Sequence, residues 1–277
     1  MSSRFSPLSI LFCGLGLTMT TLWAEDVTTT DGQIFSSTTL KRSGDLIMVK
    51  IPGPGGSGTV EMGLPLARIA KVKFAEPAEF AAAQAAEMKG DAAKVLTLTA
   101  TFVKGQADFK DLPGSWWFKM ARLRLYALAS AGRDVECAEL ARQFDLLKYS
   151  EAKLLYKAGI LFASVADSRS KTVELGAQAL PRLGGDESSA LAQLALGKAL
   201  LLKKDYVTAL KAFLVIKVFY PHVILLQPAA LMGAGDCLIG LKDPKRAGQN
   251  FEGVIQNWPD SIQAPEAKKK SDAISKN

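Results

Sequence analysis

The sequence predicts a mainly α-helical protein, in which a small N-terminal β unit precedes an α-solenoid, that is, a stack of helical hairpins. Alanine and leucine are abundant from residue 78 onward, which favours helices. Gly, Pro and Asp interrupt that part of the chain at intervals of about 12 to 18 residues, the spacing of stacked hairpins. Before residue 76, short β-prone runs alternate with turn signals. We therefore expect three segments: a signal peptide (1–24), a β unit (25–75) and a helical repeat domain (76–277).

The β unit is expected to be a small sheet or an SH3-like unit. Asp31-Gly32 separates two β-prone runs and is a strong hairpin signal. Further strands are expected at 46–51, 59–62 and 68–74. About 50 residues bury little apolar surface, so this unit should depend on its neighbour for stability.

The first 24 residues have the features of a secretory signal. Arg4 is their only charged residue, an apolar stretch follows at 8–17, and Ala24 supplies a small residue at the expected cleavage site. An uncleaved N-terminal anchor is the alternative, although the apolar stretch is short for a membrane span. We expect cleavage after Ala24, a periplasmic or secreted protein, and no stable membrane span once the signal is removed.

Charge and cysteine usage add two expectations. The net charge is +7, but the basic residues are scattered, with a single triplet at 268–270, which favours a solvated basic surface over a nucleic-acid site. Cys13 lies in the signal, whereas Cys137 and Cys237 lie in apolar helical runs. We expect two buried free thiols, with a disulfide as the alternative in an oxidising compartment.

An internal repeat occupies the C-terminal third. Aligning Gly197 with Gly235 brings four further pairs into register: Leu200 with Leu238, Ala209 with Ala247, Phe213 with Phe251, and Pro221 with Pro259. In each unit the small residue lets the second helix approach the first, Phe fills the groove towards the next hairpin, and Pro ends the second helix. These spacings resemble the tetratricopeptide (TPR) pattern.

The resemblance covers residues 187–275 and is closest to exported bacterial cell-envelope TPR proteins of the type associated with the Tol–Pal system. Residues 77–183 match only in helix length and break spacing, and the β unit stands where that family has a trimerising coiled coil. The period from Pro221 to Pro259 is 38 residues, against about 34 in the TPR pattern. The extra residues fall in an apolar loop at 222–228.

The resemblance implies a concave binding surface built from the first helix of each hairpin. Six positions on these helices are expected to face outward and contact a partner: Leu194, Lys198, Leu201, Met232, Asp236 and Ile239. The loop at 222–228 either packs between hairpins or exposes Val223 and Leu225 to a partner or a second copy of the chain.

No catalytic or metal-binding pattern is recognisable. His222 is the only histidine, so a catalytic triad or a multi-histidine metal site has at most one candidate base or ligand. Residues 53–58 match G-x-G-x-x-G, but a β-prone run follows where a dinucleotide site needs a helix. We expect a simple strand connection there, no enzyme activity, no cofactor and no metal.

The sequence thus predicts an exported, non-catalytic scaffold or adaptor that binds another cell-envelope protein through its helical surface. The alternative is a module for a cell-wall glycan or another non-protein ligand, for which Trp116-Trp117 would supply the aromatic platform. No nucleic-acid partner is expected, and a homo-oligomer is compatible with either function.

Overall fold

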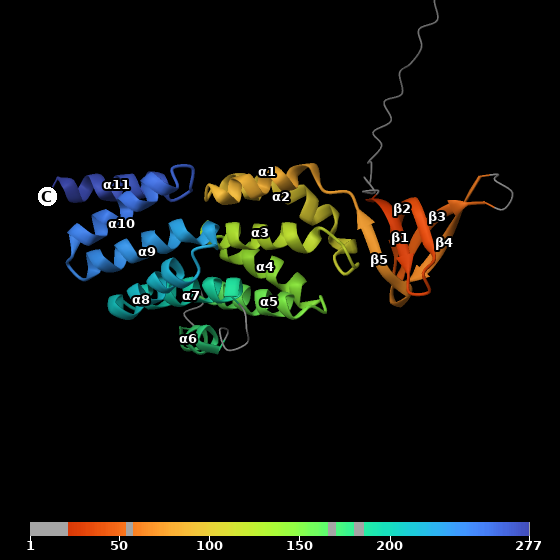
Figure 1. The fold of residues 1–277 in the computed structure, drawn as a ribbon. Helices are drawn as coiled ribbons and strands as arrows, with labels where there is room; N and C mark the ends of the chain where they lie inside the picture. The colour runs from red at the N-terminus through yellow and green to blue at the C-terminus, as the bar shows by residue number, and fades with distance from the viewer. Residues whose placement is uncertain (1–21, 54–57, 166–169, 180–185, 277) are drawn as a thin grey trace, which may run out of the picture.

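A computed structural model describes residues 22–53, 58–165, 170–179 and 186–276. Within these residues, five strands form one antiparallel sheet and eleven α-helices follow it (Figure 1). The sheet lies at one end of an elongated molecule and the C-terminal helices lie at the other. The protein is therefore mainly α-helical with a small N-terminal sheet, as predicted.

The sheet has the strand order β4-β3-β2-β1-β5, and all neighbouring strands are antiparallel. Its strands are β1 (Leu22–Thr29), β2 (Ile34–Ser43), β3 (Leu46–Pro52), β4 (Thr59–Pro65) and β5 (Ile69–Phe74). The predicted hairpin is present, and Gly32 at φ +85° makes its turn. A short 3₁₀-helix, η2 (Leu66–Arg68), links β4 to β5.

The first strand begins before the expected signal cleavage site. Ala24 is fully buried and lies opposite Thr38 of β2 and Phe74 of β5. Cleavage after Ala24 would therefore remove the first three residues of β1. Residues 1–21, which hold most of the predicted signal, lie outside the described residues.

Consecutive helices pack against one another along the chain. They are α1 (Ala78–Met88), α2 (Ala92–Gly105), α3 (Trp117–Ser130), α4 (Asp134–Asp145), α5 (Ser150–Ala163), α6 (Ser170–Ala179), α7 (Asp186–Leu202), α8 (Tyr206–Phe219), α9 (Gln227–Gly240), α10 (Pro244–Asn257) and α11 (Ala264–Ser275). Two more 3₁₀-helices connect them, η3 (Ala107–Phe109) and η5 (Ile224–Leu226). The connection at 146–149 contains neither Gly nor Pro, so no sequence signal marked it.

The aligned repeats occupy equivalent positions in two hairpins, α7–α8 and α9–α10. Gly197 lies against the ring of Phe213, and a Cβ there would approach the ring to 2.6 Å. Gly235 lies in the same way against Phe251. Both phenylalanines are buried, so each glycine permits the close approach of a helix and a ring.

The inner side of the helical unit is filled by the chain itself. Helix η5 packs against α1, α3 and α7. The connection between α10 and α11 contacts the first helices of the chain. The Gln263 side-chain amide donates to the Ser130 carbonyl of α3 at 2.7 Å. A Cβ at Gly90, in the turn between α1 and α2, would lie 2.7 Å from the Trp258 ring. No open groove therefore runs along this side between η5 and the helices that contact it.

The hydrophobic core of the sheet is separate from the cluster that fills the helical part, but it includes residues of the segment between α2 and α3. Phe109 and Leu112, which follow α2, belong to the buried cluster of the sheet. The backbone N–H of Val72 in β5 donates to the Pro113 carbonyl at 2.9 Å. Gly114 has φ +90°, and a Cβ there would clash with the Val72 carbonyl. The small β unit thus packs on residues of the segment between α2 and α3, and its dependence on them for stability stays a prediction.

Candidate interaction surfaces

Four of the eight predicted contact residues are buried. Leu194 and Met232 lie inside the helical unit, so the expectation that they face outward is wrong. The physical reason is that other segments cover both residues: Leu194 lies in the cluster that includes η5, and Met232 lies in a second cluster with residues of α10 and α11. Val223 and Leu225 are buried in the same hydrophobic cluster as Leu194. Of the two alternatives for the 222–228 loop, the structure therefore favours packing between hairpins over an apolar patch exposed to a partner.

The other four predicted residues reach the surface at least in part. The Lys198 ammonium lies 4.4 Å from the centre of the Phe162 ring. Burial lowers the pKa of Lys198, and the nearby Asp134 carboxylate partly opposes this shift. Leu201 is half-buried near the end of α7. These two residues lie at separate positions on α7.

Asp236 and Ile239, the remaining two, line a hollow of about 320 Å³ near the C-terminus. Its other lining residues are Phe251, Lys270, Ala273 and Ile274. The Asp236 carboxylate is paired with the Lys270 ammonium at 2.6 Å, so both charges of the hollow are already satisfied. Ile239 remains 45% exposed.

The tryptophan pair does not form an exposed platform. Trp117 is fully buried, and its indole N–H donates to the Val103 carbonyl at 2.9 Å. Trp116 is half-buried, packs on Phe80, and has the Lys119 ammonium 4.2 Å from its ring centre. The glycan-binding alternative gains no support from these rings.

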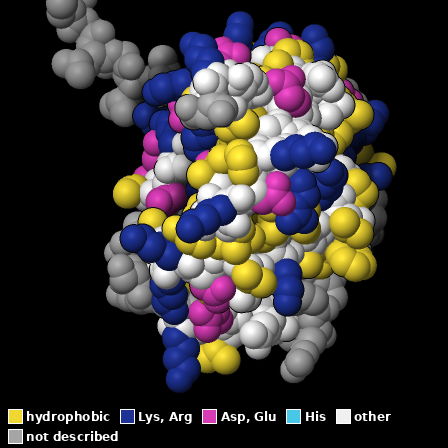
Figure 2. All heavy atoms as spheres, turned by 90° about the vertical axis from the view of Figure 1, so that its left-hand side faces the viewer, with side chains coloured by type: hydrophobic (Ala, Val, Ile, Leu, Met, Phe, Trp, Pro, Cys, Tyr) yellow, Lys and Arg dark blue, Asp and Glu magenta, His cyan; other side chains and the backbone are white. Residues whose placement is uncertain are grey.

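The outer face of α8 carries an exposed apolar stripe that the sequence analysis missed. Val207, Leu214 and Val218 follow a helical spacing of seven and four residues, so they share one face. They are 52%, 37% and 63% exposed, and the adjacent Phe219 is 68% exposed. Figure 2 shows the end of the helical unit, where hydrophobic side chains lie among Lys and Arg. We call these four residues the α8 stripe.

The second repeat provides an internal comparison for the α8 stripe. At the positions 38 residues later, α10 carries polar side chains in place of the four apolar ones: Lys245, Glu252, Gln256 and Asn257. All four are exposed. The repeat therefore folds with polar residues at these positions, and packing does not require the α8 stripe to be apolar. This contrast was available in the sequence.

Lysines lie on α8 and in the turn that precedes it. Lys211 lies within the α8 stripe at the helical spacing, and Lys217 lies beside it; both are exposed. Lys203 and Lys204 are exposed at the end of α7, where Lys203 pairs with Glu174 at 3.4 Å. The surface thus combines exposed apolar side chains with positive charge.

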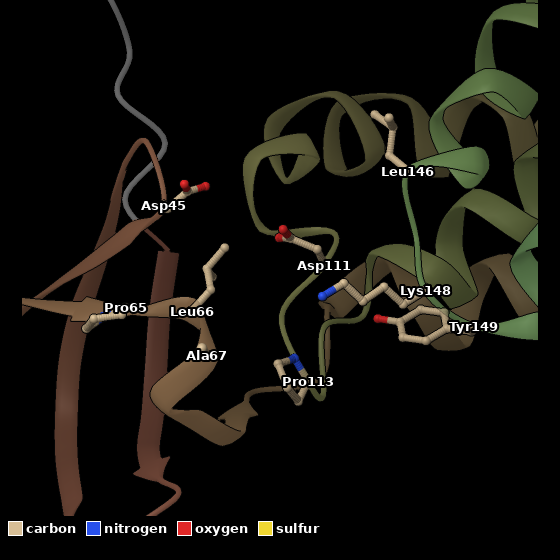
Figure 3. A pocket seen from close by; sticks show the side chains of 9 residues that line it. All are labelled: Asp45, Pro65, Leu66, Ala67, Asp111, Pro113, Leu146, Lys148 and Tyr149. Carbon is tan, nitrogen blue, oxygen red and sulfur yellow. The ribbon is translucent and has the colours of Figure 1, made fainter.

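A second candidate surface is the cleft between the sheet and the helices. Its volume is about 580 Å³, within the range of roughly 300–1,000 Å³ typical of ligand sites. Four chain segments line it, and Figure 3 shows their side chains: Asp45, Pro65, Leu66, Ala67, Asp111, Pro113, Leu146, Lys148 and Tyr149. Partial burial raises the pKa of Tyr149, and the Asp111 carboxylate adds to this shift. The phenol is therefore a hydrogen-bond donor at neutral pH.

The described residues contain no arrangement of three or more His, Cys, Asp and Glu side chains that could hold a metal ion. His222 is exposed in the loop after α8. Both Cys137 and Cys237 are buried free thiols. Among the described helices, none has the length and hydropathy needed to cross a membrane. Comparisons with protein-family models, curated proteins and solved structures found no match to this chain.

Proposed function

We propose that this protein is an exported, non-catalytic scaffold that binds another cell-envelope protein through the α8 stripe. The observation that carries the proposal is the contrast between the two repeats. The face of a helix that meets water normally carries polar side chains, yet α8 exposes four large apolar side chains where α10 carries polar ones. Exposed clusters of large apolar side chains mark sites of protein contact.

The charges around the α8 stripe indicate the chemistry of the partner. Four lysines, at 203, 204, 211 and 217, lie on or beside it. A second copy of the chain would bring like charges together, which opposes self-association through this face. A partner segment with apolar side chains flanked by Asp or Glu complements both features.

We further propose that the helices form a TPR-like stack, that the β unit is SH3-like, and that the protein is exported to the periplasm. A TPR-like stack is supported by the equivalent packing of Gly197 and Gly235 on their phenylalanines. An SH3-like β unit is supported by the strand order and by the 3₁₀ link before β5. Export to the periplasm is supported by the apolar, weakly basic N-terminus and the small residue at position 24.

Cross-linking in intact cells tests the proposal. The tagged full chain is captured, and the α8 stripe is changed to the residues that α10 carries at the matched positions: Val207→Lys, Leu214→Glu, Val218→Gln and Phe219→Asn. Because α10 folds with these residues, the melting temperature should stay close to that of the wild type. The control adds two charges of opposite sign to α10, with Gln249→Glu and Gln256→Lys, at exposed positions.

The expected result is one defined protein that is captured by the wild type and the control and reduced at least tenfold by the α8 variant. Equal capture by all three proteins would contradict the proposal. Competition by soluble cell-wall fragments would favour the glycan-binding alternative. Co-sedimentation with vesicles of anionic lipid that is lost in the α8 variant would show that a membrane, and not a protein, covers the stripe.

A further inference from the structure

The cleft between the sheet and the helices is held in shape by contacts on both sides. The Arg42 guanidinium in β2 pairs with the Asp111 carboxylate at 2.5 Å and donates to the Asp108 carbonyl at 2.8 Å. Phe109 and Leu112 extend from the same loop into the core of the sheet. These contacts fix the two walls relative to each other, so a ligand would meet a preformed site.

The cleft has apolar side chains between two opposite charges. Leu66 and Pro113 are apolar lining residues, and Leu146, which is 68% exposed, lies on the helical side. Asp45 comes from the sheet, and Lys148 comes from the α4–α5 connection across the gap (Figure 3). Within the described residues, neither the Asp45 carboxylate nor the Lys148 ammonium forms a side-chain hydrogen bond or an ion pair within 4.0 Å; the Arg42 guanidinium interacts with the Asp45 carboxylate at longer range.

The third and fourth charges near the cleft are already neutralised. Asp111 is paired with Arg42, and a smaller hollow of about 230 Å³ beside this pair shares Asp111 and Leu146 with the cleft. The Arg42 guanidinium also attracts the Asp45 carboxylate, but it forms its ion pair with Asp111. One guanidinium is thus shared by two carboxylates, which leaves excess negative charge on the sheet side, and Lys148 places a positive charge on the helical side. An anionic small molecule would satisfy Lys148 but would be repelled by Asp45.

From this geometry we infer that the cleft binds an extended segment of a partner protein in which an aliphatic side chain lies between a basic and an acidic residue. The aliphatic side chain packs on Leu66 and Pro113. The basic side chain pairs with Asp45, and the acidic one pairs with Lys148. The Tyr149 hydroxyl donates a hydrogen bond to a backbone carbonyl of the segment. This site is separate from the α8 stripe, so one molecule could hold two proteins, as an adaptor does.

Phage display with random dodecapeptides tests this inference on the full purified chain. Three proteins are screened in parallel: the wild type, a charge exchange across the cleft (Asp45→Lys with Lys148→Glu), and a control exchange on the sheet surface. The control is Lys41→Glu with Glu61→Lys, which reverses an exposed ion pair of 3.0 Å outside the cleft lining. All three proteins have the same net charge.

The wild type and the control should enrich the same peptides, with Lys or Arg and Asp or Glu on either side of Leu, Ile or Val. Their affinities, measured by fluorescence anisotropy, should fall at least tenfold in the cleft exchange and in Leu66→Asp. Peptides enriched by the cleft exchange should carry the two charges in the reverse order. The absence of enrichment by the folded wild type, or equal binding to the wild type and both cleft variants, would overturn the inference.

Discussion

The sheet should lose stability when Leu112, a residue of the helical part, is truncated. Leu112 is fully buried in the cluster that forms the core of the sheet. Leu→Ala substitutions at such sites cost about 2–5 kcal/mol, because burial is lost and a cavity remains. For Leu112→Ala we expect about 3 kcal/mol.

This loss is large compared with what the sheet can supply. Residues 22–74, at roughly 0.05–0.15 kcal/mol per residue, correspond to about 3–8 kcal/mol of stability. A loss of about 3 kcal/mol raises the population of the unfolded sheet roughly 100-fold. The helices at the far end of the molecule do not contact Leu112 and should keep their own local stability.

Hydrogen exchange followed by mass spectrometry separates these effects. In Leu112→Ala, slowly exchanging amides of β2 and β3 should exchange about 100-fold faster, while peptides from α9 and α10 should change less than twofold. Leu146→Ala, at a position 68% exposed, is the matched control and should leave both regions unchanged. Unaltered exchange in β2 and β3, or equal acceleration throughout the chain, would refute a core shared between the sheet and the loop after α2.

Two further predictions concern the helical unit. Burial raises the pKa of Cys137 and of Cys237 to about 12, so iodoacetamide at pH 8 should label neither thiol in the native protein and both in denaturant; rapid native labelling would contradict their burial. Gly235→Ala should cost about 2 kcal/mol in urea unfolding, because its methyl group would clash with the buried Phe251 ring. Gly248→Ala is the control, since the nearest atom lies 4.0 Å from the added Cβ, and it should be neutral or stabilising by about 0.5–1 kcal/mol.

Features encoded by neighbouring residues could be predicted from the sequence. The hairpin at Asp31-Gly32 forms because glycine readily adopts the positive φ of its turn. The repeat alignment paired Gly197 with Gly235 correctly, since each glycine contacts a phenylalanine of its own hairpin. The residues that make these interactions are close in the sequence, so a local sequence pattern can predict them.

Features that depend on distant segments could not be predicted in this way. Leu194 and Met232 were assigned to an open surface because a helical pattern distinguishes faces but does not say what covers each face. Leu194 lies in the large buried cluster of the helices, and its helix α7 packs against α5, α9 and η5, which come from other parts of the sequence. The cleft likewise combines four segments between residues 45 and 149, and no single segment shows a binding pattern.

The sequence by itself determined the mainly helical class, the small sheet at the N-terminus and the matched hairpins, because glycine, proline and apolar periodicity act over a few residues. The tertiary structure alone decided which apolar faces are buried. The 222–228 loop and α8 are both rich in apolar residues, yet the loop is packed inside the helical unit while α8 keeps Val218 and Phe219 exposed. The physical reason is that burial is set by the neighbours that the folded chain brings together, and those neighbours come from remote parts of the sequence.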